Sequence, residues 1–242
     1  MDGKGTARQG TRAVALAIVV SVWALGLTLR APGAAASESK CFGQAPTIVG
    51  TEGPDEIEGT AGADVISAGA GNDEIEGMGG DDRICGGDGD DFLSGGDGVD
   101  RIEGGPGNDG VYGRDGADVE LGGPGDDELT GGGSDPGADD LRGGGGNDYL
   151  LGQNGNDHLS GGSGADVLQG DGGDDRESGG SGDDIVSGNM GDDALSGGDG
   201  DDGVFGNDAN DTLDGGGGQD NLNGGYGGDS CVNGESVVAC EG

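Results

Sequence analysis

The chain of 242 residues is poor in aromatic residues, basic residues and histidine. Aromatics make up 3% of the residues, there is one histidine, and 10 Lys and Arg oppose 49 Asp and Glu, giving a net charge of −39. Nucleic acid repels a polyanion of this strength, so a nucleic-acid partner is excluded. The sequence has no cluster of His and Cys, which excludes zinc and copper sites.

The same shortage of aromatics, together with 66 glycines, is typical of a solvated, acidic, disordered chain. The placement of the aliphatic residues argues against that alternative. Val, Ile or Leu recurs once every nine residues, always two residues after an aspartate. A disordered chain has no reason to keep such a period, so we expect an ordered, repetitive fold.

Twenty copies of a nine-residue unit run from Gly50 to Val232, broken only by a three-residue insertion at 131–133. Typical copies are GTAGADVIS (59–67), GGDGDDFLS (86–94) and GGSGADVLQ (161–169), with the pattern G-G-x-G-x-D-x-U-x, where U is a large aliphatic. Position six is Asp in all twenty copies, position four is Gly in nineteen, and position eight is Val, Ile or Leu in seventeen. One frame kept over twenty copies is not a chance match.

Each unit predicts a sharp turn followed by a short strand. Glycine at positions one and four, often with Asn or Asp at position five, tolerates positive φ and leaves carbonyl oxygens free to point at one spot. Positions seven to nine form a strand with the aliphatic facing inward. Two units complete one coil, and stacked coils give two parallel sheets in a rod about 48 Å long. The prediction is all-β: a parallel β-roll, or right-handed β-helix solenoid, of about ten coils.

The aliphatic core of such a roll is too thin to order the chain alone, because a third of the repeat residues are glycines, which lose the most backbone freedom. Calcium can supply the missing stabilisation. Carboxylate, carbonyl and water oxygens at six or more positions suit Ca²⁺, whereas many octahedral Mg²⁺ sites are not expected. One ion between each pair of neighbouring turns on two edges gives at most about 18 Ca²⁺.

The repeats resemble the RTX (repeats-in-toxin) calcium-binding family over about three quarters of the chain. The resemblance implies a β-roll in which each ion lies between turns of one edge, held by the position-six Asp and by turn carbonyls. One edge would use Asp55, Asp73, Asp91, Asp109, Asp127, Asp148, Asp166, Asp184, Asp202 and Asp220. The other would use Asp64, Asp82, Asp100, Asp118, Asp139, Asp157, Asp175, Asp193, Asp211 and Asp229. We interpret the Asp or Asn found at position five in twelve units as a turn former rather than a ligand.

Some repeats depart from the pattern. Glu120 and Glu177 stand where an aliphatic should face inward, as does Cys231. Because an unpaired buried carboxylate is costly, we expect either a local strand slip, which in the first case brings Val119 or Leu121 inward, or an open coil. The insertion lengthens the turn that carries Asp139, which we expect to be harmless, with a weaker ion site as the alternative. Ala209, in place of the position-four Gly before Asp211, leaves the same alternative open for that site.

The N-terminal segment predicts export. Lys4, Arg8 and Arg12 precede an apolar run at 13–29 and the small residues 34–36, which is typical of a secretory signal peptide at 1–36 cut before Ser37. The alternative is an uncleaved membrane anchor, for which the apolar run is barely long enough. We expect a secreted, extracellular protein, with cell-surface attachment as the variant. Cleavage leaves six basic and 48 acidic side chains, a net charge of −42.

Four cysteines in an exported chain suggest two disulfides. Cys231 and Cys240 bracket the tail and would pin a C-terminal cap at 233–242, which leaves Cys41 and Cys85 as the other pair. That bridge crosses about two coils, so it requires the N-terminal cap at 37–49 to fold back before Thr47. The segments APTIVGT and ICGG also resemble stand-alone secreted RTX-type proteins, which favours this pairing.

We do not expect an enzyme, because only residues 37–49 lie between the predicted cleavage site and the repeats, and His158 is interpreted as a surface residue. The prediction is a secreted, monomeric calcium-binding protein whose repeats fold on binding many Ca²⁺ ions outside the cell, without an integral membrane partner. The alternative is a calcium-dependent adhesin or cell-envelope component. An adhesive patch would draw on exposed apolar residues among Phe92, Tyr112, Tyr149, Leu151 and Phe205.

Overall fold

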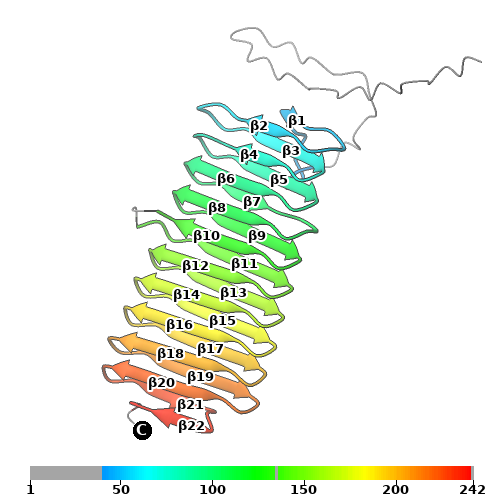
Figure 1. The fold of residues 1–242 in the computed structure, drawn as a ribbon. Helices are drawn as coiled ribbons and strands as arrows, with labels where there is room; N and C mark the ends of the chain where they lie inside the picture. The colour runs from blue at the N-terminus through cyan, green and yellow to red at the C-terminus, as the bar shows by residue number, and fades with distance from the viewer. Residues whose placement is uncertain (1–39, 134–135, 241–242) are drawn as a thin grey trace, which may run out of the picture. The chain divides into compact units, whose positions relative to one another are not determined.

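The computed structural model describes residues 40–133 and 136–240, which belong to one compact unit. These residues form two stacked parallel sheets of eleven strands each (Figure 1). No helix long and apolar enough to cross a membrane occurs among them. The predicted signal peptide at 1–36 lies outside the described residues.

Strands alternate between the two sheets along the chain, so we call them the odd sheet and the even sheet. The odd sheet contains β1 (Ile48–Val49), β3 (Val65–Ala70), β5 (Arg83–Asp88), β7 (Arg101–Glu103), β9 (Val119–Pro124), β11 (Asp140–Gly145), β13 (His158–Ser163), β15 (Arg176–Ser181), β17 (Ala194–Asp199), β19 (Thr212–Gly217) and β21 (Ser230–Val232). The even sheet contains β2 (Glu56–Glu58), β4 (Glu74–Glu76), β6 (Phe92–Asp97), β8 (Gly110–Asp115), β10 (Glu128–Gly132), β12 (Tyr149–Asn154), β14 (Val167–Gly172), β16 (Ile185–Met190), β18 (Gly203–Asp208), β20 (Asn221–Tyr226) and β22 (Ser236–Val238).

Each strand pairs in parallel with the strand one coil later, for example Ile66 with Ile84. The three-residue insertion lengthens the chain between the paired residues Leu129 and Leu150, and the register of this strand pair is kept. The predicted all-β parallel roll of about ten coils is therefore confirmed. Most strands are longer than predicted, six residues rather than three, because positions one to three of the next repeat also pair, as in the Asp97 N–H bond to the Met78 carbonyl at 3.0 Å.

The core is a double row of position-eight side chains between the sheets. Their exposed fractions lie between 0% and 8%: Ile57, Ile66, Ile75, Ile84, Leu93, Ile102, Val111, Leu129, Leu141, Leu150, Leu159, Leu168, Val186, Leu195, Val204, Leu213 and Leu222. Glu120 and Glu177 stand in the same row and are equally buried. The prediction of a slipped or open strand at these two glutamates is wrong. Glu120 pairs with Ile102 and Leu141, and this register on both sides holds it inward.

Glycines serve two different needs in the turns. Position four is in the left-handed region, as at Gly89 (φ +133), and so is position two, where non-glycine residues such as Asn189 (φ +73) also occur. Position-one glycines such as Gly86 are not in that region. Our prediction that position one supplies positive φ is therefore wrong, and its glycine has a steric reason given below.

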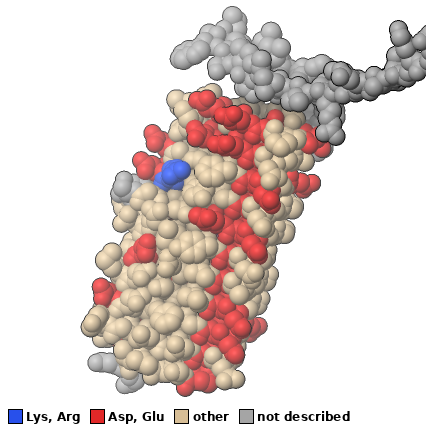
Figure 2. Space-filling model, viewed as in Figure 1, with Lys and Arg blue, Asp and Glu red and all other residues tan. Residues whose placement is uncertain are grey.

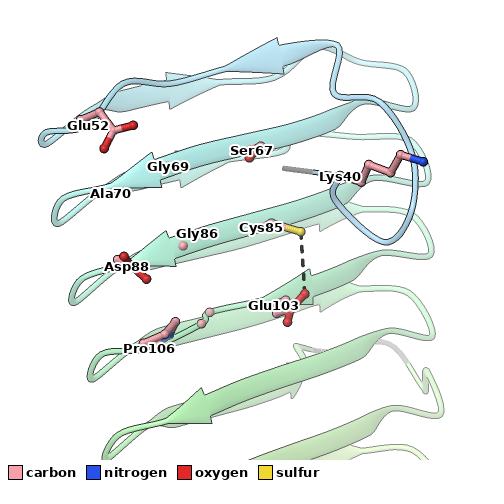
Figure 3. A pocket seen from close by; sticks show the side chains of 13 residues that line it. Lys40, Glu52, Ser67, Gly69, Ala70, Cys85, Gly86, Asp88, Glu103 and Pro106 are labelled. Atoms are coloured by element: carbon pink, nitrogen blue, oxygen red, sulfur yellow. Dashed lines mark hydrogen bonds between the residues drawn. The ribbon is translucent and has the colours of Figure 1, made fainter. Parts of the chain in front are cut away.

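Both disulfides connect the predicted pairs. Cys41 is bonded to Cys85 on β5, and Cys231 on β21 to Cys240. The segment before Thr47 folds back over the odd sheet, as expected, and the Phe42 ring lies 4.7 Å from the guanidinium carbon of Arg101 on β7. This segment borders a shallow pocket of about 350 Å³ whose rim carries Lys40, Cys85 and Glu103 (Figure 3).

Candidate calcium sites

The position-six aspartates form two columns, one along each edge of the roll. The backbone N–H of each, except the last in each column, donates to Oδ1 of the aspartate one coil later, for example Asp91 to Asp109 at 2.9 Å and Asp64 to Asp82 at 2.8 Å. The Asp55 column holds the ten residues predicted for one edge and the Asp64 column the ten for the other. From Asp73 to Asp229 their exposed fractions are only 0% to 3%. Each column is thus a stack of buried carboxylates in adjacent coils.

A cap residue continues one end of each column. Pro46 has no N–H to donate to Asp64, and the Thr47 hydroxyl donates to Asp64 Oδ1 at 3.3 Å instead. At the other end, Glu235 Oε2 accepts the Asp220 N–H at 2.7 Å, in the role of the next aspartate. Sequence reasoning missed Glu235, because it lies outside the nine-residue frame and no pattern marks it.

The second carboxylate oxygen, Oδ2, is buried and lacks a hydrogen-bond partner in most of these aspartates. The exceptions at the start are Asp55 and Asp64, whose Oδ2 atoms accept the Thr51 and Thr60 amides at 2.5 and 2.8 Å. Buried oxygens without a partner occur in Asp73, Asp82, Asp91, Asp100, Asp109, Asp127, Asp148, Asp166, Asp175, Asp184, Asp193, Asp202, Asp211, Asp220 and Asp229. Since buried polar atoms are almost always satisfied, a repeated buried carboxylate oxygen without a partner is suited to bind a cation.

Backbone carbonyls from the neighbouring coil lie beside these oxygens. A Cβ atom built on Gly86 would lie against Asp91 Oδ2 and 2.8 Å from the Gly104 carbonyl oxygen. A Cβ on Gly77 would likewise lie 2.6 Å from Asp82 Oδ2 and against the Gly95 carbonyl oxygen. Position one is glycine in nearly every repeat, Ala68 being an exception, because a side chain would fill a small space lined by oxygens, which we call the oxygen cradle.

Position-four carbonyls add oxygens from the preceding coil. A Cβ on Gly155 would collide with the Gly137 carbonyl and lie 2.5 Å from Asp157 Oδ1. No group of three or more His, Cys, Asp or Glu side chains that could hold a metal ion occurs among the described residues. Besides the aspartate carboxylate, the oxygens that lie beside the cradle of a regular repeat are backbone carbonyls. Carboxylate and carbonyl oxygens at about 2.3 to 2.6 Å are the donors that Ca²⁺ takes, so the cradle fits this ion.

Burial raises the pKa of several aspartates in the columns, and carboxylates in adjacent coils raise it further at Asp109, Asp148 and Asp175. The pKa of Asp148 is raised to about 7, first by burial and then by Asp166 and Asp127, although a backbone hydrogen bond offsets part of the shift. The pKa values of Asp109 and Asp175 are also raised to about 7. Repulsion within a column is what a divalent cation would relieve.

Asp and Asn at position five form a separate, exposed ladder. Asp90 Oδ1 accepts the Asn108 N–H at 2.9 Å, and Asn108 Oδ1 accepts the Asp126 N–H at 2.9 Å. This placement agrees with their interpretation as turn residues. Acidic side chains also form a band along the surface of the roll (Figure 2).

The irregular repeats keep the column geometry. Across the insertion, the Asp118 N–H still donates to Asp139 Oδ1 at 2.9 Å. Ala209 adopts the strained left-handed conformation (φ +92), and Asp211 keeps its hydrogen bond to Asp229 at 2.9 Å. Weaker ion binding at Asp139 and Asp211 stays an alternative, because the hydrogen bonds around them are those of regular repeats.

The model of the family described as RTX calcium-binding nonapeptide repeat (4 copies) matches residues 49–84, 85–120, 112–135, 134–168, 169–204 and 205–235. These segments cover most of the chain. The chain belongs to this family. RTX repeats bind calcium in a β-roll, and the cradles of this roll bring together carboxylate and carbonyl oxygens, the kinds of ligand that Ca²⁺ binds. No curated protein matches the chain.

Proposed function

We propose that this RTX protein is a secreted calcium-binding protein whose repeats fold on binding many Ca²⁺ ions outside the cell. The observation that carries the proposal is the repeated buried Oδ2 without a partner, in aspartates stacked one coil apart. With calcium, each of the twenty aspartates would contribute to a site between neighbouring turns. The number of ions is at most about 18, one per pair of neighbouring turns on each edge.

The columns make the metal-free roll unstable near neutral pH. Carboxylates in adjacent coils repel each other and are buried away from water, which is costly unless they are paired or neutral. The chain should therefore be expanded where calcium is scarce, inside the cell. Extracellular calcium, at about 10⁻³ M, would saturate sites typical of extracellular modules and so drive folding after export.

Two features support export. The segment 1–36 has the composition of a cleaved signal peptide. Both disulfides also fit an oxidising compartment, since such bonds rarely persist in the cytosol. Export and cleavage are tested by the molecular mass of the protein recovered from the medium of producing cells. Cleavage before Ser37 is the expected result, whereas full-length protein held in the membrane fraction would instead identify an anchor.

Calcium-driven compaction is tested by the hydrodynamic radius of the purified protein with calcium, with magnesium and with chelator. We expect a compact species only with calcium. Equal radii in all three conditions would contradict the proposal.

An adhesive role is the second candidate, favoured by the outer face of the even sheet. Phe92, Tyr112, Tyr149, Leu151 and Phe205 all lie on this face. The Phe92 and Tyr112 rings are 4.9 Å apart, and Phe92 and Tyr149 are 40% and 38% exposed. Aromatic residues grouped on one rigid face can anchor a partner.

Sedimentation with cell-wall material, with and without calcium, separates a simple calcium binder from an adhesin. An adhesin should sediment only with calcium, and Phe92→Ser with Tyr149→Ser should release it. The matched control replaces Val119 and Leu121, on the outer face of the odd sheet, by serine. Sedimentation unchanged by the even-sheet variant would contradict an adhesive role for that face.

We propose binding rather than catalysis. His158 lies on the outer face of the odd sheet, where its side chain is 48% exposed and its Nδ1 is 3.4 Å from Asp140 Oδ1. This exposed pair supports the interpretation of His158 as a surface residue.

A further inference from the structure

Glu120 and Glu177 are the two acidic side chains in the core row. Glu120, on β9, is 0% exposed between Ile102 and Leu141, and Glu177, on β15, is 1% exposed between Leu159 and Leu195. All four of their carboxylate oxygens are buried without a hydrogen-bond partner. An ionised carboxylate in this state is costly to bury unless a cation or a proton neutralises it.

Both glutamates bend from the core toward the edge of the roll and reach an oxygen cradle. A Cβ atom on Gly113 would lie against Glu120 Oε1 and 2.5 Å from Asp118 Oδ2. In the second case, a Cβ on Gly170 would lie against Asp175 Oδ2 and 2.6 Å from Glu177 Oε1. Each cradle thus has two carboxylates from one repeat.

Repeats with an aliphatic residue at position eight have different oxygens beside the position-one glycine. At Gly95 of the same column of turns, the oxygens nearest to a Cβ are Asp100 Oδ2 and, at 2.8 Å, the Gly113 carbonyl. In the two irregular repeats the glutamate oxygen stands among the nearest neighbours instead. The same arrangement arises twice, in coils separated by β11 and β13, so it is not an accident of one turn.

We propose that Glu120 and Glu177 are calcium ligands, each adding a second carboxylate to the site of the aspartate two residues before it. The inference rests on the proposed calcium binding of the roll. A site with two carboxylates from one repeat has more ligand charge than a regular site, and calcium affinity rises with ligand charge. These two sites are therefore the tightest of the Asp64 column.

The test is a calcium titration of the purified full chain against a chromophoric chelator, with bound calcium counted by equilibrium dialysis. The variants are Glu120→Gln with Glu177→Gln, which keeps the shape, and Glu120→Leu with Glu177→Leu, which restores the aliphatic of the repeat. The matched control, Glu128→Gln, removes a charge from an exposed position-seven residue of β10. Far-UV circular dichroism at saturating calcium verifies that each variant is folded.

We expect both double variants to fold and to bind calcium more weakly at these two sites, with affinity there reduced by about tenfold or more. The control should keep the wild-type affinity. Leucine variants that bind as many ions as the wild type, with equal affinity, would overturn the inference. Absence of calcium binding by the wild-type protein would instead overturn the proposed function, so the two failures are distinguishable. A crystal structure with calcium should show the ion bonded to Glu120 Oε1, and density at Asp118 alone would contradict the proposal.

Discussion

A single methyl group added at Gly161, the position-one glycine before Asp166, should close a calcium site. At Gly161, a Cβ would lie against Asp166 Oδ2 and 2.7 Å from the Gly179 carbonyl oxygen. Gly172, on the next strand along the chain (β14), is a matched control. Its Cβ would have no neighbour closer than 3.6 Å, an ordinary contact, and neither glycine has positive φ.

The size of the effect follows from these contacts. At Gly161 the carboxylate and the carbonyl must move apart by about 1 Å to reach van der Waals distance, and overpacking of this kind costs about 1 to 3 kcal/mol. That energy corresponds to about a 5- to 150-fold loss of affinity at the site. Gly172→Ala removes backbone freedom from the unfolded chain without a clash, so it should be neutral or slightly stabilising.

The assay is equilibrium dialysis in chelator-buffered calcium, combined with the calcium midpoint of folding. Gly161→Ala should bind at least one ion fewer and should fold at higher calcium, while Gly172→Ala matches the wild type. Equal binding by Gly161→Ala and the wild type would refute the oxygen cradle as the ion site, because the methyl group occupies that space.

Three further predictions concern acid, the C-terminal cap and the disulfide. The pKa of about 7 for Asp109, Asp148 and Asp175 in the folded roll exceeds the ordinary value of 3.8. Between these pH values the metal-free roll therefore binds more protons than the unfolded chain does. The stability that these aspartates contribute is fully present below about pH 4 and is lost as the pH rises through 7. Chelated protein should thus show more β-structure at pH 4.5 than at 7.5, and the calcium midpoint should rise on acidification; the opposite trend would contradict the burial of the columns. Glu235→Ala removes the acceptor of the Asp220 N–H, so backbone hydrogen exchange should be faster than in the wild type in β20 and β22 but not in β6. Exchange rates equal to those of the wild type in all three strands would show that the cap is dispensable. Replacing Cys41 and Cys85 by serine should lower the free energy of unfolding by about 2 to 4 kcal/mol in denaturant with calcium present, and an unchanged midpoint would show that the N-terminal segment is held without the bridge.

The periodic residues predicted most of the fold. Asp at position six and an aliphatic at position eight led to two parallel sheets, two edges and the composition of each column. The sequence did not predict the full length of the strands. Positions one to three pair through the backbone groups of glycine-rich segments, which have no periodic side-chain pattern.

The site was less predictable than the fold. The steric role of the position-one glycine depends on where Asp Oδ2 points, which the sequence does not encode by spacing. We expected the strand at Glu120 to slip and turn this side chain outward, because burying an unpaired carboxylate is costly and a strand without neighbours would be free to slip. In the roll, a slip of one residue would also break the pairing with Ile102 and Leu141 and displace Asp118 from its column, so the buried glutamate is retained.

The measurement that tests the account most directly is far-UV circular dichroism of the purified protein during a Ca²⁺ titration, with Mg²⁺ as the control. We predict a cooperative transition from coil to β-structure near 10⁻⁴ to 10⁻³ M Ca²⁺ that Mg²⁺ does not cause and chelator reverses. A spectrum already rich in β-structure without calcium, or one that remains coil at every concentration, would contradict calcium-driven folding.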